Sequence, residues 1–229
     1  MTLKREDLEN GLFRRLWQQL ESGPRPLTDE EQAASLADTL AGMRESEDVW
    51  VFGYGSLLWN PLFHYEERRP ATIRGFHRRF CLWSKMGRGT PANPGLVLGL
   101  DRGGSCCGLA YRLPAGKAAA ELRLLWRREM VVGSYEPRWL RVEAAPCAVS
   151  HGCAEELRAL TFVVRRDHPF YAGRLPFDTV ACALASANGH IGSSADYLFH
   201  TVEALAAHGL RDGYLDRLSA RVLRERSAP

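Results

Sequence analysis

Short segments rich in valine, isoleucine, phenylalanine, tyrosine and tryptophan fill the middle of the chain, and Gly and Pro turns separate them. Residues of these types favour β-structure, so each segment between two turns predicts one strand. The predicted strands are 49–53, 72–83, 96–100, 106–112, 138–149 and 158–165. The predicted helices are 115–130, embedded among the strands, and then about 176–188, 194–208 and 213–226. This order predicts an α+β fold whose sheet curls into a barrel.

The first residues of the chain have a different residue pattern, which predicts helices rather than strands. Leucine recurs at every fourth position over residues 8–20, which predicts one helix. After the break at SGPRP, Thr28 and Glu31 have the spacing of a capping box and mark the start of a second helix. We therefore predict a helical N-terminal extension over residues 1–48 and a main domain over residues 49–229.

The charge pattern argues against nucleic acid as a partner. The chain has 30 Lys and Arg against 27 Asp and Glu, a net charge of +3, and they are spread without a long block of one sign. The longest apolar stretches are far shorter than a membrane span, and the first residues, MTLKREDLEN, lack the apolar core of a signal peptide. We therefore expect no membrane association and a cytoplasmic location.

The cysteines and histidines show no spacing that is typical of a metal site. The chain has no CxxC and no HExxH motif, and its histidines are scattered. A chain of 229 residues can bury a core without disulfides, so the cysteines are predicted to be reduced thiols in the core. They are Cys81, Cys106, Cys107, Cys147, Cys153 and Cys182. Whether the adjacent Cys106 and Cys107 sense redox conditions stays open.

The stretch VFGYGSLLWNP, residues 51–61, places two glycines and a serine at the end of the first predicted strand. It does not fit a dinucleotide fingerprint, because Leu58 stands where the third glycine belongs. No Lys-Ser or Lys-Thr pair closes a P-loop, and Tyr54 and Leu58 replace the glycines of a nucleophile elbow around Ser56. A glycine turn with exposed N–H groups can bind a carboxylate or stabilise an oxyanion. The alternative is a plain turn that Tyr54 and Ser56 cap.

Glu129 has an unusual position on the predicted helix 115–130. It extends an apolar stripe at spacings i, i+3, i+4 and i+7, whose other members are Leu122, Leu125 and Trp126. It also lies in the last turn, where the helix dipole disfavours negative charge. Both effects would raise the pKa of Glu129, which suits proton transfer. The alternatives are a solvated carboxylate beyond an earlier helix end, or an ion pair with Arg127, Arg128 or another basic residue.

Other features admit both a functional and a structural interpretation. Arg88, in the loop GRGTPANPG, could clamp a substrate carboxylate or could be a solvated loop arginine. Tyr197, in ADYLF, heads an amphipathic helix and is favoured as a core residue. Asp167 and His168 could form a catalytic pair, but RRDHPFY is typical of a strand exit followed by a turn at Pro169.

Several of these stretches occur together in an order that is typical of one family. FGYGSLLWNP, then GRGT with PG close behind, then GLAYRLP leading into a helix that ends in RE, and finally ADYLF together resemble the ChaC-type γ-glutamylcyclotransferases. The resemblance runs from about residue 49 to residue 210, and the helical extension together with RREM is similar to the longer bacterial members. The turn YGSL alone is shared by the wider superfamily, so the combination is what indicates ChaC.

The resemblance implies a small mixed barrel with flanking helices and a cavity, no cofactor, and a lyase reaction that cleaves glutathione to 5-oxoproline and cysteinylglycine. By residue, it implies a substrate-binding turn at Tyr54, Gly55, Ser56 and Leu57, a general acid/base at Glu129, and substrate contacts from Arg88 and Tyr197. Shorter family members have Gly-Gly-Tyr soon after the glutamate, whereas here Tyr135 comes two positions later, which leaves its role open.

The implied reaction needs no enzyme nucleophile, because the α-amine of the γ-glutamyl group attacks its own side-chain carbonyl and closes a five-membered ring. One carboxylate can accept the proton of the amine and return it to the leaving nitrogen, so Ser56 is assigned to binding. Two other functions stay open: the same ring closure on γ-glutamyl amino acids or γ-glutamylamines, and a non-catalytic regulatory binding module. The oligomeric state is not predicted.

Overall fold

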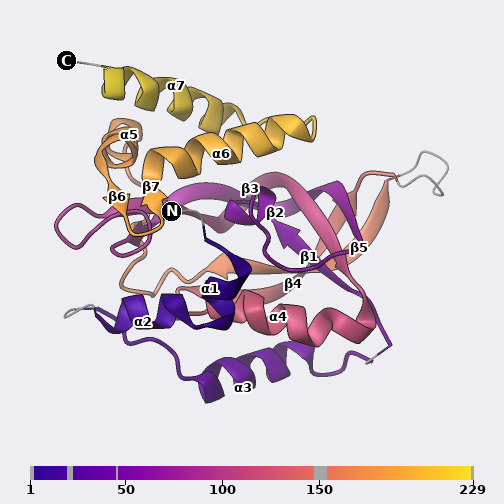
Figure 1. The fold of residues 1–229 in the computed structure, drawn as a ribbon. Helices are drawn as coiled ribbons and strands as arrows, with labels where there is room; N and C mark the ends of the chain where they lie inside the picture. The colour runs from indigo at the N-terminus through magenta and orange to yellow at the C-terminus, as the bar shows by residue number, and fades with distance from the viewer. Residues whose placement is uncertain (1–2, 20–22, 45, 147–153, 228–229) are drawn as a thin grey trace.

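A closed barrel of five strands lies at the centre of the computed structural model, which describes residues 3–19, 23–44, 46–146 and 154–227 (Figure 1). Around the barrel the strands follow the order β1, β3, β2, β4, β5. The strands are β1 (Val49–Gly53), β2 (Glu67–Ser84), β3 (Gly95–Leu113), β4 (Tyr135–Ala144) and β5 (Glu155–Val164). β5 pairs in parallel with β1 and β3, and the other pairs are antiparallel. The predicted α+β fold with a mixed barrel is confirmed.

The longest strands bend rather than stop at their glycines. The predicted strands 96–100 and 106–112 form one continuous strand, β3, so the turn expected between them is wrong. Gly103 and Gly104 adopt left-handed backbone angles, with φ of 97° and 72°, and let β3 bend there without ending. The predicted strand 138–149 corresponds to β4, and its last three positions lie outside the described residues.

Helices cover the barrel on two sides (Figure 1). One group follows the barrel strands and consists of α5 (Phe177–Ser186), α6 (Ser194–Ala207) and α7 (Gly213–Ser227), with the short hairpin β6 (Asn188–Gly189) and β7 (Gly192–Ser193) before α6. On the other side, the apolar stripe of α4 (Ala115–Glu129) packs against the barrel. The ring centres of Trp126 in α4 and Phe162 in β5 are 5.3 Å apart. Of the helices described, none is both long and apolar enough to cross a membrane.

The N-terminal segment forms short helices that pack beside α4. The single helix predicted over residues 8–20 is wrong: α1 (Arg5–Glu9) and α2 (Leu12–Gln18) are separate, because Gly11 takes a left-handed backbone angle with φ of 66°. The predicted capping box is confirmed at the start of α3 (Asp29–Leu40). The Glu31 N–H donates to Thr28 Oγ1 over 3.1 Å, and the Thr28 N–H donates to Glu31 Oε2 over 2.8 Å.

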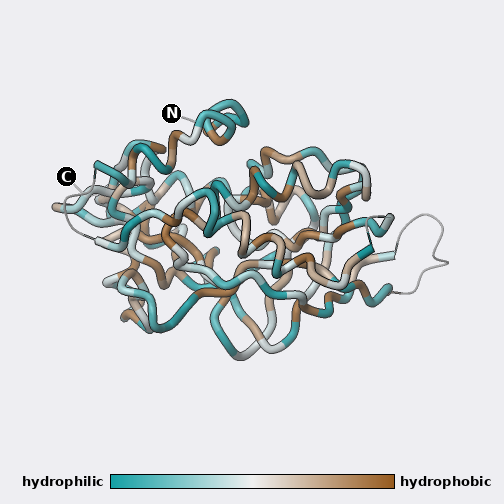
Figure 2. Tube along the Cα trace, turned by 90° about the horizontal axis from the view of Figure 1, so that it is seen from below, coloured by the Kyte–Doolittle hydropathy of each residue, from teal (hydrophilic) through white to brown (hydrophobic). Residues whose placement is uncertain are grey.

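Hydrophobic and hydrophilic segments alternate over short distances along the chain (Figure 2), as expected where helices and strands turn one face to a core. The described cysteines are free thiols: Cys81 and Cys106 are buried and Cys107 is half-buried. The core prediction is wrong for Cys182, which is exposed because it lies on the outer face of α5. Cys147 and Cys153 lie outside the described residues.

A buried ion pair joins the first helix to α4. Glu121 is 4% exposed, and its carboxylate accepts hydrogen bonds from Arg5 Nη1 at 2.7 Å and Arg5 Nη2 at 3.1 Å. It also accepts the backbone N–H of His64 at 2.9 Å. Burial acts to raise the pKa of Glu121, but the hydrogen bonds and the charge of Arg5 outweigh it, so the pKa is lowered. The ionised carboxylate therefore stabilises the docking of α1.

Replacing this carboxylate should destabilise the protein in a pH-dependent way. We expect Glu121→Gln to lower the free energy of unfolding by about 1–3 kcal/mol at neutral pH, because it removes charge-assisted hydrogen bonds from a buried site. Since the pKa of Glu121 is lower in the folded state, this stabilisation is present above the unfolded pKa and is lost as the pH falls through the folded pKa. The difference between the two proteins should therefore shrink below about pH 4.

Urea unfolding of both proteins at pH 7 and pH 3.5 measures the difference. The control is Glu6→Gln, which removes an exposed carboxylate from the same end of the chain. Equal stability of the wild type and Glu121→Gln at pH 7 would contradict the role assigned to this pair.

Candidate active site

The predicted substrate turn lies at the end of β1 and winds into a short 3-10 helix, η1 (Ser56–Leu58). The Leu58 N–H donates to the Gly55 carbonyl over 2.9 Å, and the Asn60 N–H donates to the Ser56 carbonyl over 2.9 Å. The N–H of Ser56 is a donor to the hydroxyl of Tyr197. The turn thus uses one backbone N–H, that of Ser56, to contact a tyrosine of α6.

Gly55 is required by space, since two elements approach each other closely at this position. Its φ is −131°, which any residue can adopt. A Cβ built on Gly55 would lie 2.6 Å from the Tyr197 hydroxyl oxygen, and one on Gly53 would lie 2.9 Å from the Leu57 Cβ. The turn therefore approaches both its own helix and α6 more closely than a residue with a side chain allows.

Buried tyrosines hold this part of the barrel in place. The Tyr54 hydroxyl donates to the Phe162 carbonyl over 2.7 Å, and the Tyr111 hydroxyl donates to the Leu57 carbonyl over 2.7 Å. The Tyr135 hydroxyl donates to the Leu98 carbonyl over 2.8 Å. Burial raises the pKa of Tyr54 and Tyr135 well above the ordinary value, so both hydroxyls stay protonated. Each is positioned as a neutral donor to a backbone carbonyl.

Glu129 is the last residue of α4, and its side chain is 15% exposed. The helix extends to this residue. The alternative of an earlier helix end followed by a solvated carboxylate is therefore wrong. The carboxylate lies 3.2 Å from Arg128 Nε. This contact is the ion pair that the sequence analysis gave as the other alternative. Burial raises the pKa of Glu129, and the charge of Arg128 opposes that effect in part. A buried carboxylate of raised pKa is a stronger base when ionised.

The sequence analysis named Arg128 as one candidate ion-pair partner of Glu129 and missed that it lines the site. Its side chain is 7% exposed, and Nη1 donates to the Asn60 carbonyl over 2.5 Å. Burial lowers the pKa of Arg128, and the charge of Glu129 acts in the opposite direction. Helical spacing placed Arg128 away from the apolar stripe, but at the end of a helix both sides of the last turn can face the fold. In the sequence, the position of Arg128 directly before Glu129 was the signal that could have indicated its place in the site.

Arg88 lies in the loop between β2 and β3 and is half-buried, in contrast to a solvated loop arginine. Its guanidinium carbon lies 5.5 Å from the centre of the Trp59 ring and 5.4 Å from that of Tyr197. Nη1 donates to the Ser193 carbonyl over 3.4 Å. Burial lowers the pKa of Arg88. The rings of Trp59 and Tyr197 also contact each other, with 6.0 Å between their centres, so the arginine lies against both rings at the edge of the site.

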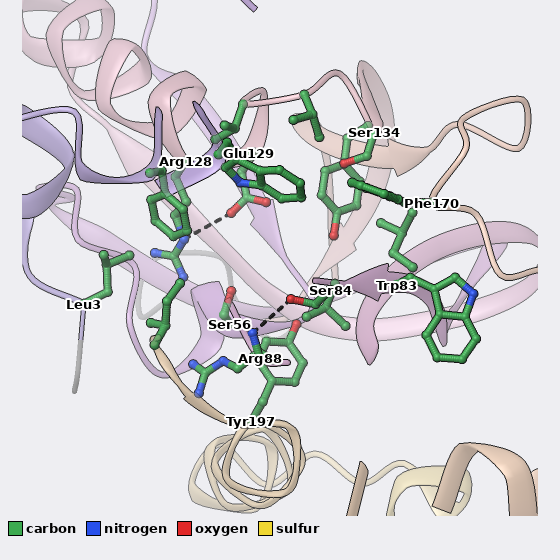
Figure 3. A pocket seen from close by; sticks show the side chains of 18 of the residues that line it. Leu3, Ser56, Trp83, Ser84, Arg88, Arg128, Glu129, Ser134, Phe170 and Tyr197 are labelled. Carbon is green, nitrogen blue, oxygen red and sulfur yellow. Dashed lines mark hydrogen bonds and ion pairs between the residues drawn. The ribbon is translucent and has the colours of Figure 1, made fainter. Parts of the chain in front are cut away.

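The predicted residues meet around one cavity region (Figure 3). Its inner end is lined by Tyr54, Gly55, Ser56, Leu57, Leu98, Glu129, Tyr135, Phe162 and Tyr197. Its outer part, a cavity of about 150 Å³, has Ser56, Glu129 and Tyr197 in its lining together with Arg88 and Arg128. In Figure 3, Arg128 and Glu129 project from the end of α4, and Tyr197 projects from α6 on the other side.

The charged side chains that line this cavity region are Arg88, Arg128 and Glu129 among the residues that the structure describes. A site with more positive than negative side chains favours an anionic ligand. Across the described ranges, no group of three or more His, Cys, Asp and Glu side chains is placed to hold a metal ion.

Asp167 and His168 do not belong to this site. Asp167 pairs with Arg165 over 2.7 Å at the surface, and the His168 ring nitrogen Nε2 lies 3.1 Å from the Val132 carbonyl oxygen. The structural interpretation of RRDHPFY, a strand exit followed by a turn, therefore holds for these residues.

Comparison with known proteins gives one family and relatives that are named γ-glutamylcyclotransferases. The family model described as ChaC-like protein matches residues 49–225. The chain is 40% identical over 189 residues to an Escherichia coli K12 protein named glutathione-specific γ-glutamylcyclotransferase, covering 82% of this chain and 79% of that protein. It is 30% identical over 169 residues to human glutathione-specific γ-glutamylcyclotransferase 1, covering 72% of this chain and 73% of that one.

A solved structure of similar fold has the same description. The crystal structure of a γ-glutamyl cyclotransferase specific to glutathione from yeast has a TM-score of 0.71 to this chain at 27% identity. The similarity covers 79% of this chain and 97% of the yeast one. Since the family match spans most of the chain and agrees with the barrel and the shared turn, the chain belongs to the ChaC-like protein family.

Proposed function

We propose that this protein is a glutathione-specific γ-glutamylcyclotransferase, a lyase that converts glutathione to 5-oxoproline and cysteinylglycine. The observation that carries the proposal is Glu129, a buried carboxylate of raised pKa that lines the same cavity as the turn at residues 54–57. The 40% identity to an enzyme of this name supports the choice of substrate. A pure binding module has no use for a base of raised pKa in such a cavity.

The charges of the cavity suit the charges of the substrate. The γ-glutamyl group carries an α-carboxylate and an α-amine on one carbon atom. Arg88 and Arg128 would hold the carboxylate, because arginine binds carboxylates through paired N–H donors. Glu129 would then face the neighbouring amine. The turn at residues 54–57 and the ring of Tyr197 would enclose the γ-carbonyl at the inner end.

In the proposed reaction, Glu129 first accepts a proton and then donates it again. The amine nitrogen attacks the γ-carbonyl carbon and forms the new C–N bond of the five-membered ring, and its proton passes to the Glu129 carboxylate. The bond from that carbon to the cysteinyl nitrogen then breaks, and Glu129 returns the proton to the leaving nitrogen. Because both reacting groups belong to one substrate molecule, the site contributes mainly by holding them in the attack geometry.

The turn would stabilise the negative charge that forms on the carbonyl oxygen. The Leu57 N–H would be the donor, because Leu57 lines the inner end of the cavity and the Ser56 N–H already donates to the Tyr197 hydroxyl. A preorganised donor of this kind contributes about 3 kcal/mol to such a transition state. Ser56 is assigned to binding, since the attacking nitrogen is supplied by the substrate.

We extend the proposal to the organisation and location of the protein. Residues 1–48 form an extension to a main domain over residues 49–229, which is supported by a family match that begins at residue 49. A cytoplasmic location is supported by the free state of the described cysteines, since thiols persist in reducing compartments. The reaction as written draws on these side chains and the substrate alone, and involves neither nucleic acid nor membrane.

Incubation of the purified protein with glutathione, without added metal or cofactor, tests the function directly. Mass spectrometry should detect 5-oxoproline and cysteinylglycine in equal amounts. A parallel reaction with γ-glutamyl-alanine distinguishes the related activity on γ-glutamyl amino acids. Formation of 5-oxoproline from neither compound would overturn the proposal and favour the binding module.

Removal of the base should abolish turnover while the fold is kept. We expect Glu129→Gln to lower kcat by at least about 100-fold, the lower end of what general acid–base groups contribute. The control is Glu203→Gln, an exposed carboxylate on α6 away from the cavity, and thermal unfolding checks that both variants are folded. A rate near that of the wild type would end the assignment of Glu129.

Arg128 should set the pH at which the enzyme becomes active. Its charge lowers the pKa of Glu129, so Arg128→Met should raise that pKa further. The base must be ionised to act, and the acidic limb of the kcat/KM profile should therefore move to higher pH. The matched control is Arg127→Met on the same helix, whose side chain instead donates to the Glu9 carbonyl. An acidic limb that stays in place or moves to lower pH would contradict this role.

A further inference from the structure

The N-terminal helices supply part of the wall of the active-site cavity. Leu3, Phe13 and Trp17 line the outer cavity together with Glu129, although all three lie outside the family match over residues 49–225. The ring of Trp17 packs against that of Phe170, with 5.4 Å between the ring centres. A cavity wall built from this segment gives it a function that the resemblance does not assign.

The cavity has a charged side and an apolar side. In Figure 3, Trp83 and Phe170 lie across the cavity from Arg88 and Arg128. The apolar side consists of Phe13, Trp17, Trp83, Val132 and Phe170 among others. A ligand that reaches across the cavity therefore meets cations on one side and aromatic or aliphatic carbon on the other.

Hydrogen bonds join the N-terminal segment to α4 and to the chain just after the substrate turn. Arg5 in α1 bonds to Glu121 in α4, the helix that ends in Glu129. The Asn60 side-chain amide donates to the Leu3 carbonyl over 3.0 Å, close after the substrate turn. These bonds, together with the stacking of Trp17 on Phe170, fix the wall relative to the base.

We infer that α2, which α1 helps to hold in place, completes the subsite for the leaving group and favours a compact apolar or thiol side chain on the residue that follows the γ-glutamyl group. This inference rests on the proposed function. With the γ-glutamyl end at Glu129 and residues 54–57, the small inner end has no space for the rest of the substrate. The leaving portion then extends into the outer cavity, where its first side chain contacts the wall of Phe13 and Trp17.

Two tripeptides that differ in one side chain test the inference. Glutathione and γ-glutamyl-glycyl-glycine share every backbone and charged group, and only glutathione carries the CH₂SH group. We expect Trp17→Ala to lower kcat/KM for glutathione by roughly fivefold, mainly through KM, because a small apolar contact is lost. The value for γ-glutamyl-glycyl-glycine should change by less than about twofold, since that substrate makes no such contact. Where its turnover is too slow to follow, its inhibition constant against glutathione gives the same comparison.

The matched control is Trp139→Ala, which removes a half-buried tryptophan that bonds to the Thr39 carbonyl and does not line the cavity. Thermal unfolding checks each variant, and Phe13→Ala and Trp17→Leu repeat the measurement if Trp17→Ala does not fold. An unchanged preference between the two tripeptides in folded, active variants would overturn this inference alone. A wild-type protein that releases 5-oxoproline from neither tripeptide would overturn the proposed function as well.

Discussion

The site depends on a carboxylate that is kept out of water at the end of a helix. Glu129 lies in the last turn of α4, and the helix is held to the barrel by the apolar stripe that includes Trp126. The cost of burying a charge there is offset in part by the guanidinium of Arg128, which is itself buried. Both groups stand at the end of α4, so the packing of this helix also positions the chemistry of the cavity.

The rest of the cavity is built by hydroxyl groups that bond to backbone carbonyls. Tyr54 and Tyr135 come from different parts of the barrel, and they donate to main-chain oxygens of Phe162 in β5 and Leu98 in β3. Such bonds fix the rings while leaving the hydroxyl groups neutral, which keeps the cavity free of further negative charge. The arginines then determine the net charge that a ligand experiences.

The sequence permits prediction of the parts that obey local rules. The capping box at Thr28 and the position of Glu129 on an apolar stripe follow from spacing along a helix, and both agree with the structure. The continuous path of β3 through Gly103 and Gly104 could not be predicted, because a glycine pair marks a bend as readily as a turn.

The missed features depend on contacts between distant segments. Arg128 enters the site because the helix ends where it meets the Asn60 carbonyl, which no spacing along α4 reveals. Trp17 enters because α2 packs against Phe170, far along the chain. For Gly55 the resemblance identified the position, but its physical reason is the approach of Tyr197, which only the folded chain supplies.

The closeness of Gly55 to Tyr197 has a consequence for synthesis of the protein. The turn and α6 are also joined by the hydrogen bond from Trp59 to Thr201, whose partners are 142 positions apart in sequence. A chain still leaving the ribosome can form β1 and α4, yet it lacks one side of the cavity until α6 has emerged. Contacts of such long range form late in folding. The inner end of the cavity, which Tyr197 helps to line, is therefore completed only by one of the last helices to be synthesised.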